Sequence, residues 1–333
     1  MIYSISHNDL DGYSSQLLVK MYADQTNQKI TMFNVNYGKE LLFAIESLDL
    51  TKNDFVFITD LNLEENVALL LDKLKEQIGF KLQVIDHHET GKNIASKYSW
   101  YFYNKEHSAT KLTYDFFTQY FKEPEFVYLV NLYDMWIEEN KDFEKAKSLN
   151  TAFKDILKHY TKNIMELRRD FAFELIFSFS KILLKEKNIF KAEKKISKLE
   201  RRFLSGDKFK SISTLRAEKA YEYIYENEMY KLVSFGGYKI KVLIDLNEVF
   251  QEVSHIILNK EKDIDFVIHI NKQGFMSFRS SENRPSVELF AKQYFDGGGH
   301  RNASGGALNG ARNGKKFKKE DLFELFLNQL NII

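Results

Sequence analysis

The sequence contains no cysteine and only two prolines in 333 residues. The absence of cysteine excludes a thiol nucleophile, a zinc–thiolate site and a disulfide framework, so any metal ion must be held by oxygen and imidazole ligands. No apolar run approaches the ~18 residues of a membrane span. The first residues, MIYSISHNDLDG, do not have the basic and then apolar layout of a signal peptide. We therefore expect a cytoplasmic protein that does not bind membranes.

The chain also lacks a strong net charge. The formal charge is +1, so the chain as a whole is not a general binder of polyanions. Its length is typical of two domains, and 44% hydrophobic residues are enough for a sizeable core. Residues 181–219 depart from this balance, with thirteen Lys or Arg against five Asp or Glu. This stretch is either a solvated helical connector or a basic track for a nucleic-acid backbone.

Acidic and imidazole side chains follow three apolar runs, at the points where buried strands would end. The run 81–85 is followed by Asp86, His87 and His88, the run 54–59 by Asp60, and the run 1–6 by His7, Asp9 and Asp11. In an open parallel α/β sheet, ligands bind outside the carboxyl ends of the strands. Each motif alone has an ordinary explanation as a turn, cap or salt bridge. Their joint occurrence at strand ends predicts a metal site.

The ligand types indicate which metal this site would hold. Carboxylates and imidazoles without thiolates suit Mn²⁺ or Mg²⁺, with Co²⁺ or Zn²⁺ as alternatives. Two such ions, roughly 3.5–4 Å apart, activate a water and clamp the oxygens of a phosphoryl displacement. Asp60 could bridge two ions with its two oxygens. Asp134 lies among bulky apolar residues in a predicted helix, where a buried carboxylate needs a partner.

Strand and helix patterns alternate in the first part of the chain, which predicts an α/β fold with a parallel sheet covered by helices on both faces. Predicted strands are 1–6, 29–35, 55–59, 82–85 and 99–103, and predicted helices are 12–22, 39–48, 63–77, 108–120 (capped by Ser108) and 124–138. Residues 150–227 have a single glycine and no proline, and we expect them to be wholly helical. Strands resume at 230–235, 238–244, 266–270 and 275–280, with helices at 247–258 (capped by Asn247), 287–294 and 321–330. The predicted organisation is a catalytic metal-binding domain (1–150), a helical connector (151–228) and a smaller α/β substrate-binding domain (229–333), with the active-site cleft between domains.

A glycine-rich segment, Gly297–Gly306, marks the last of these domains. We interpret it as a loop whose backbone amides cradle an anion, a flexible turn being the alternative. Arg279, at the end of a predicted strand, is a good bidentate phosphate clamp. The candidate substrate-binding residues are Arg279, Gly298, Gly299, His300, Arg301, Asn302 and Ser304.

Together these motifs resemble the DHH phosphoesterase family, named for the triplet seen here as Asp86-His87-His88. Three further stretches look like other family motifs: His7-Asn8-Asp9-Leu10-Asp11-Gly12, Thr59-Asp60 and Tyr133-Asp134-Met135-Trp136. Gly297–Gly306 with Phe278-Arg279-Ser280 resembles the family's DHH-associated C-terminal domain. The spacing of His7 and Asp9 is shorter than in the pyrophosphatase branch, and the glycine motif also argues against that branch.

The resemblance implies a two-domain, Mn²⁺-dependent phosphoesterase with two ions. It implies one ion held by His7, Asp9 and Asp60, and a second held by Asp11, Asp60, His87 and Asp134. Asp60, Asp86 and His88 would be the catalytic residues, with His88 supporting the ligands or contacting the phosphate.

The expected activity is hydrolysis of short oligonucleotides, as in the nanoRNase-like members of the family. Nucleotides such as pAp are further substrates that the resemblance implies. Linear or cyclic dinucleotides are also candidates, because the helical insert is longer than in compact oligoribonucleases. The expected partners are therefore short RNA or DNA oligonucleotides or nucleotides. The oligomeric state stays open, a dimer included.

Two alternatives remain. One is a processive single-strand exonuclease that uses the basic helices. The other is a non-catalytic, nucleotide-binding regulatory protein, although a binding module has no need to converge so many carboxylates.

Overall fold

The computed structural model describes the chain except residues 161–163, 205–206, 247–248, 316 and 332–333. The chain divides into two compact units. The first comprises Met1–Ile156 and Arg169–Leu199, and the second comprises Leu157–Arg168 and Glu200–Ile333. Residues 151–228, expected as a separate connector, are thus distributed over both units. Among the described helices, none combines the length and apolar character needed to cross a membrane.

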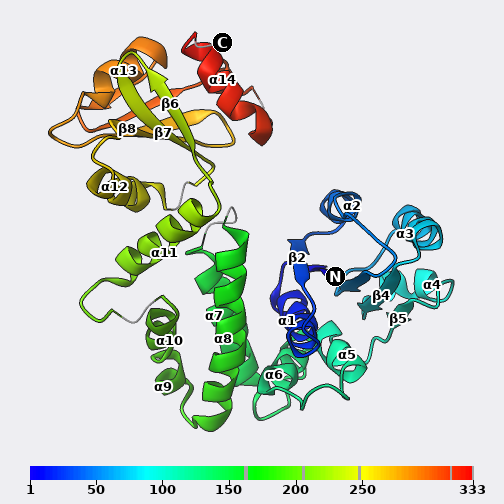
Figure 1. Cartoon of the computed structure of the whole chain (residues 1–333). Coiled ribbons are helices and arrows are strands. Elements are labelled where there is room, and N and C mark those ends of the chain that lie inside the picture. Colours follow the sequence, from blue (N-terminus) through cyan, green and yellow to red (C-terminus); the bar gives the residue numbers. More distant parts are fainter. Residues whose placement is uncertain (161–163, 205–206, 247–248, 316, 332–333) are drawn as a thin grey trace. The chain divides into compact units, whose positions relative to one another are not determined.

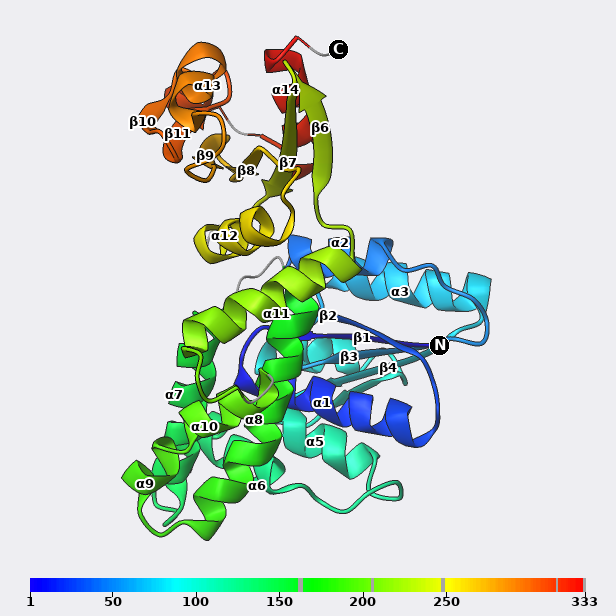
Figure 2. The same ribbon diagram turned by 60° about the vertical axis from the view of Figure 1, so that its left-hand side comes forward.

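The first unit is built on a five-stranded sheet in the order β2-β1-β3-β4-β5, and every neighbouring pair is parallel. The strands are β1 (Ile2–His7), β2 (Ile30–Val35), β3 (Phe55–Thr59), β4 (Lys81–Asp86) and β5 (Tyr101–Tyr103). Its helices are α1 (Leu10–Gln25), α2 (Lys39–Glu46), α3 (Glu65–Ile78), α4 (Lys92–Ala95), α5 (Ala109–Phe116) and α6 (Glu125–Asp134). Figure 2 shows α2 and α3 on one side of the sheet and α1 and α5 on the other. This arrangement confirms the predicted α/β class.

The central strands β1, β3 and β4 are buried along most of their length because helices cover both of their faces. Their side chains point alternately into two helical layers. The polar residues begin where the strands end. All three carboxyl ends therefore deliver Asp and His to one edge of the sheet, which is the feature of the fold that positions the site.

Several helix boundaries differ from the prediction, and those of α1, α5 and α6 differ most clearly. α1 begins at Leu10, two residues before the predicted start, because the Asp9 carboxylate accepts a hydrogen bond from the Gly12 amide and caps the helix. α5 ends at Phe116 and not at Tyr120, since the Phe117 amide bonds a carbonyl three residues back and the chain continues as turns.

α6 ends at Asp134 and not at Glu138, so Asp134 is the last helical residue and not a mid-helix one. The amide of Trp136 bonds the carbonyl of Tyr133, and the amide of Ile137 bonds that of Leu132, at 3.2 and 3.0 Å. These two bonds form a Schellman motif, which ends the helix.

The middle of the chain is helical, as predicted, in its described residues. Its helices are α7 (Phe143–Leu157), α8 (Met165–Lys185), α9 (Ile189–Glu193), α10 (Ile196–Phe203) and α11 (Ile212–Glu226), so the segment is interrupted and not continuous. Tyr13 of α1 packs edge-on against Phe153 of α7 and Phe173 of α8, with ring centroids 5.2 and 6.3 Å apart. These contacts pack α7 and α8 against α1 within the first unit.

The second unit contains a six-stranded mixed sheet in the order β10-β11-β9-β8-β7-β6, in which only the β7–β8 pair is parallel. The strands are β6 (Lys231–Phe235), β7 (Tyr238–Ile244), β8 (Phe266–Ile270), β9 (Phe275–Arg279), β10 (Gly298–His300) and β11 (Ala303–Ala307). The helices are α12 (Phe250–Lys260), α13 (Val287–Tyr294) and α14 (Leu322–Gln329) (Figure 1). The predicted cap Asn247 lies outside the described residues. A phenylalanine-rich core joins the sheet to α13 and α14.

The prediction of a loop at Gly297–Gly306 is wrong, because this segment forms the antiparallel hairpin β10–β11. Its glycines allow the two strands to approach closely. A Cβ at Gly297 would lie 2.2 Å from the Gly305 carbonyl oxygen, and one at Gly299 would lie 2.8 Å from that of Ala303. Gly299 also has a φ of +146°, which side-chain-bearing residues rarely adopt.

Candidate metal centre

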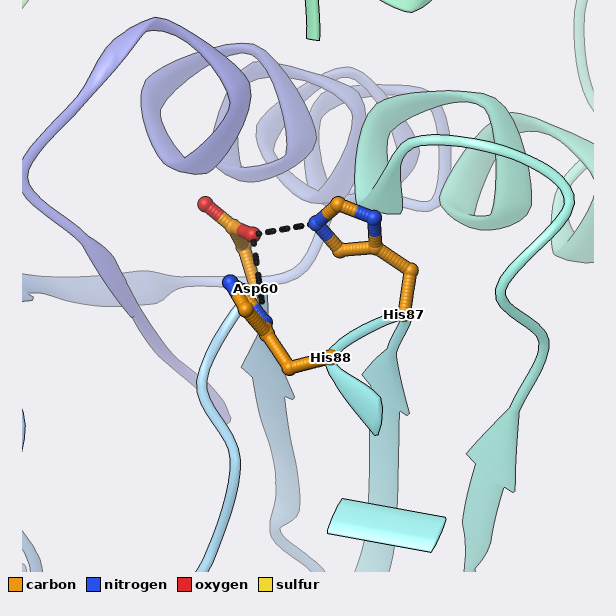
Figure 3. A group of neighbouring side chains, drawn as sticks. All are labelled: Asp60, His87 and His88. Atoms are coloured by element: carbon orange, nitrogen blue, oxygen red, sulfur yellow. Dashed lines mark ion pairs between the residues drawn. The ribbon is translucent and has the colours of Figure 1, made fainter. Parts of the chain in front are cut away.

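Asp60 occupies the middle of the site. It follows β3 directly, its amide donates to the Ile85 carbonyl at the end of β4, and its side chain is almost completely buried. Its φ of +58° lies in the left-handed region, which aspartate tolerates better than most residues. One carboxylate oxygen, Oδ1, is 3.4 Å from His87 Nε2, while Oδ2 is 3.7 Å from His7 Nδ1. The two carboxylate oxygens of Asp60 therefore face different histidines, His87 and His7. Figure 3 shows Oδ1 facing His87 and His88 while the other oxygen points away from both.

On one side, Asp60 meets His7 and Asp9, whose ligand atoms form the first group that could hold a metal ion. His7 Nδ1 lies 3.0 Å from Asp9 Oδ2. The close turn from β1 into α1 depends on Gly12, where a Cβ would be 2.3 Å from the His7 carbonyl oxygen. Burial opposes the charge of His7, but the carboxylates of Asp60 and Asp9 outweigh it and raise the pKa of His7 to about 10. Burial likewise opposes the charge of Asp9, but His7 outweighs it and lowers the pKa of Asp9 to about 2.

A second group consists of Asp11, His87 and Asp134. His87 Nε2 lies 3.7 Å from Asp11 Oδ2 and 3.5 Å from Asp134 Oδ2. The Asp11 carboxylate also accepts hydrogen bonds from the amides of Ala109 and Thr110, at 2.8 and 2.9 Å. These amides begin α5, and a helix N-terminus stabilises a negative charge. Burial raises the pKa of Asp11. Burial, followed by the charge of Asp11, raises the pKa of Asp134 to about 8.

The third group, Asp60, His87 and His88, shares members with both others. Within each group the ligand atoms lie within 4.8 Å of one another. Two carboxylate oxygens, Asp60 Oδ2 and Asp134 Oδ2, are buried and accept no hydrogen bond from the described residues. Burial, with the charges of Asp9 and Asp11, raises the pKa of Asp60 well above its usual range. Buried carboxylates at such distances need protons or cations, so this set of oxygen and imidazole donors fits divalent ions.

Asp86 stands outside these groups, although the sequence predicts a catalytic role for it. Its carboxylate is fully buried and faces His88 and Tyr101. Oδ1 is 2.7 Å from His88 Nδ1, and Oδ2 accepts a hydrogen bond from the Tyr101 hydroxyl at 2.7 Å. His88 Nε2 is 3.1 Å from the Tyr37 hydroxyl. In the neutral ring, we assign the Nδ1 proton to the bond with Asp86, which leaves Nε2 to accept from Tyr37. Asp86 thereby fixes the orientation of His88.

Sequence reasoning missed Tyr37 and Tyr101, because an aromatic residue beside a strand is ordinarily a core residue. Tyr37 also packs against the His7 ring, with centroids 4.7 Å apart. Gly91, three residues after the Asp86-His87-His88 triplet, is the one weak sequence signal of the contact between Tyr101 and Asp86. A Cβ there would lie 2.3 Å from the Tyr101 hydroxyl and 2.7 Å from Asp86 Oδ2. Only glycine leaves room for that hydrogen bond.

The predicted phosphate clamp, Arg279, ends β9 in the second unit. Its guanidinium lies 5.6 Å from the Phe250 ring centroid and donates to the Phe278 carbonyl. It lines a cavity of about 420 Å³ together with α11, α12, His255 and Ser280. Burial lowers the pKa of Arg279. No salt bridge to Arg279 is found in the described part of the chain, so the guanidinium can receive an anion.

The β10–β11 hairpin lies beside Arg279, since Ala303 pairs with it in the sheet. Several predicted contact residues there have structural partners. The Arg301 guanidinium donates to the Arg284 carbonyl, and the Ser304 hydroxyl donates to the His300 carbonyl. The Asn302 carbonyl accepts from the amide of Ser280, while His300 is exposed.

Gly298 differs from its neighbours in the hairpin. Nothing lies within 4 Å of a Cβ placed there, and its φ is not in the left-handed region. Packing in the described chain therefore does not require glycine at this position. Gly298 remains the best candidate in the hairpin for close approach of a ligand.

A parallel α/β sheet with three overlapping Asp/His groups at its carboxyl edge defines an α/β protein with a candidate site for divalent ions. Residues 1–140 match the DHH family, N-terminal domain. The 3′,5′-cyclic-nucleotide phosphodiesterase of Helicobacter pylori (strain ATCC 700392 / 26695) is 27% identical over 361 residues, which cover 98% of this chain and 99% of that protein. The crystal structure of an uncharacterized protein from Helicobacter pylori G27 is 26% identical, covers 99% of both chains and has a TM-score of 0.79.

Proposed function

We propose that this protein is a two-metal phosphodiesterase acting on small nucleotides. One observation carries the proposal: the two oxygens of Asp60 face two different sets of His and Asp ligands. A carboxylate shared between two cation sites holds two ions close together, as in the two-metal sites that catalyse in-line phosphoryl displacement. The DHH family match and the phosphodiesterase relative support the same chemistry.

Two ligand sets follow from this geometry. The first ion would be held by His7, Asp9 and Asp60, and the second by Asp11, Asp60, His87 and Asp134. Mn²⁺ is the preferred ion, with Mg²⁺ or Co²⁺ as alternatives. Such a pair would supply Lewis acidity at the phosphoryl group and would lower the pKa of a water molecule to about 7.

The chain's own residues orient the substrate. His88 is clamped by the buried Asp86 on Nδ1, so its Nε2 is held in a fixed direction at a partly exposed position. That nitrogen can donate to a phosphoryl oxygen when the ring is protonated. Tyr37, whose hydroxyl already contacts Nε2, can hold a proton at the same place. We propose that this pair contacts the scissile phosphate.

The substrate class follows from two indications. The Helicobacter pylori relative is described as a 3′,5′-cyclic-nucleotide phosphodiesterase, which favours cyclic nucleotides. The sequence motifs favour short oligonucleotides, dinucleotides and pAp. We propose that the protein hydrolyses small nucleotide phosphodiesters. We further propose Arg279 and the β10–β11 hairpin of the second unit as substrate-binding residues.

A processive exonuclease is less well supported. It needs many free cations along its track, but several basic residues of the middle segment are already paired. Lys195 contacts Glu186, Lys210 contacts Glu218, and Arg216 contacts Glu200. Paired cations release fewer counterions on binding a strand.

A substrate panel tests the proposal. Purified protein with Mn²⁺ is offered 3′,5′-cyclic AMP, pAp, a dinucleotide, a 5-mer and a 25-mer, with bis-p-nitrophenyl phosphate as a generic phosphodiester. We expect turnover of the small substrates and little of the 25-mer. Nucleotide binding without hydrolysis of any substrate in Mn²⁺, Mg²⁺ or Co²⁺ would instead identify a binding protein.

The role of Arg279 is tested separately by Arg279→Lys. Lysine keeps the charge but loses the planar fork, so KM should rise about tenfold with metal binding unchanged. Arg312→Lys is the control, because Arg312 is an exposed arginine of the same unit. A parallel loss of metal affinity would contradict the assignment of Arg279 to the substrate.

A further inference from the structure

Trp136 adopts an unusual backbone conformation next to the metal centre. It lies two residues after Asp134, in the first position beyond the C-cap of α6. Its φ is +50°, in the left-handed region. The Schellman motif places glycine or asparagine at this position, because a bulky side chain there strains the backbone. The sequence nevertheless has tryptophan, so the local fold does not account for the residue.

Burial does not account for it either. Trp136 is 57% exposed, whereas an aromatic residue that stabilises a core is normally buried. Its ring is still held in place. It packs edge-on against Tyr133 and Phe143, with centroids 5.8 and 5.2 Å apart. A strained backbone thus presents an oriented indole with open surface, a pattern that points to function.

The position suits a nucleotide bound at the metal centre. The Cα atoms of Asp134 and Trp136 can be at most about 7 Å apart, since consecutive Cα atoms are separated by ~3.8 Å. This reach is comparable with the span from the phosphate to the base of one nucleotide. We infer that Trp136 is the platform on which the nucleobase of the substrate stacks. The inference rests on the proposed function and adds a specificity-determining residue to it.

Stacking would make the enzyme selective for nucleotides over other phosphodiesters without selecting one base, because every base has an aromatic face. Among the described residues of the first unit, no other exposed aromatic side chain stands on a left-handed backbone. Phe190 is 62% exposed but lies within α9, with the Lys194 ammonium 4.2 Å from its ring centroid. It is therefore a suitable control for the loss of an exposed ring.

The intrinsic fluorescence of the protein reads out the contact without catalysis. The chain has two tryptophans, and the other, Trp100, is buried and donates to Asp72. In Trp100→Phe, Trp136 is the only indole. With Mg²⁺ present, AMP should quench this fluorescence, while ribose 5-phosphate, which lacks a base, should not. Equal quenching by both compounds, or quenching by neither, would overturn the inference.

Steady-state kinetics give a second test that does not depend on the Trp100 variant. Trp136→Ala should raise KM for the best nucleotide substrate about 5- to 150-fold, the range for removing one stacking ring, with kcat and Mn²⁺ affinity retained. Trp136→Phe keeps an aromatic face, so its KM should stay within about threefold of wild type. Phe190→Ala should leave KM unchanged.

The outcomes separate the two proposals. An active enzyme whose KM is unaffected by Trp136→Ala refutes the stacking role and leaves the phosphodiesterase assignment intact. A wild-type protein that hydrolyses no phosphodiester refutes the assignment. In that case, fluorescence quenching by AMP but not by ribose 5-phosphate still supports a contact between the base and Trp136.

Discussion

Replacing Asp60 by asparagine probes the shared carboxylate with little change to the backbone. Asparagine tolerates the left-handed conformation that Asp60 adopts, whereas alanine would add strain. The variant removes one negative charge that both proposed ion sites use. Transition-state stabilisation by the cations amounts to several kcal/mol. A loss of about 4 kcal/mol lowers the rate by about three decades.

Although it lowers the rate, the same variant should not lower the stability of the metal-free protein. Burial and the neighbouring charges of Asp9 and Asp11 make ionised Asp60 unfavourable when no cation is bound. An uncharged amide relieves this repulsion. The Tm of metal-free Asp60→Asn should therefore equal or exceed that of wild type.

The stabilisation by Mn²⁺ should in turn largely disappear. A ligand at 100 times its Kd stabilises a protein by about 2.7 kcal/mol. The variant loses that increment if its metal affinity falls by two decades or more. Thermal unfolding with and without Mn²⁺, together with the rate on the best substrate, measures both effects.

Asp245→Asn is a matched control. Asp245 follows β7 as Asp60 follows β3, has a φ of +60°, and its amide donates to the Ile270 carbonyl at the end of the neighbouring strand. It is also buried, but it belongs to none of the metal-binding groups found in the described residues. It should keep the Mn²⁺-induced shift in Tm. An Asp60→Asn enzyme with a tenth of the wild-type rate, or with an undiminished Mn²⁺ shift, would refute the bridging role.

Three further predictions concern the neighbourhood of the site and the hairpin. Because burial and nearby charge raise the pKa of Asp134 to about 8, the folded metal-free protein binds more protons than the unfolded chain between about pH 4 and 8. Its stability should fall as pH rises through that window, and Asp134→Asn should flatten the dependence in urea unfolding at several pH values. Tyr101→Phe removes the hydrogen bond that steadies the carboxylate behind His88, and should lower kcat about 10- to 100-fold with the fold retained by circular dichroism. Gly298→Ala should raise KM without changing stability, whereas Gly306→Ala, whose Cβ would lie 2.9 Å from a Phe295 carbon, should destabilise the protein by about 1–3 kcal/mol in urea. Equal stability losses in the two glycine variants would contradict the assignment of Gly298 to substrate binding and of Gly306 to packing.

Much of the fold can be predicted from the sequence because its strands are apolar runs that end abruptly. The run before Asp60 and the run before Asp86 are largely buried on both faces, so each is mainly apolar and its polar end is clear. Helix ends are harder to predict. The Schellman turn after α6 uses Trp136 where glycine is usual, and no local signal marks it.

The groups that could hold a metal ion are predictable for the same reason. In a parallel sheet, the residues after neighbouring strands meet at one edge, so His7, Asp60 and His87 converge without any knowledge of the loops. Side-chain direction at a strand end cannot be read from the sequence. Consecutive residues there point to opposite sides, and Asp86 points inward to Tyr101 while His87 joins the ligands. The hairpin is not recognisable from the sequence, because strands made mostly of glycine, alanine and serine have no hydrophobic pattern.

The stoichiometry of metal binding tests the central claim most directly. Equilibrium dialysis of the metal-free protein against Mn²⁺ counts the bound ions, and Asp60→Asn is measured in parallel. We predict two Mn²⁺ per chain for wild type and a marked loss of affinity at both sites in the variant. Failure of wild type to bind Mn²⁺, or two sites of unchanged affinity in Asp60→Asn, would contradict a bridged two-metal centre.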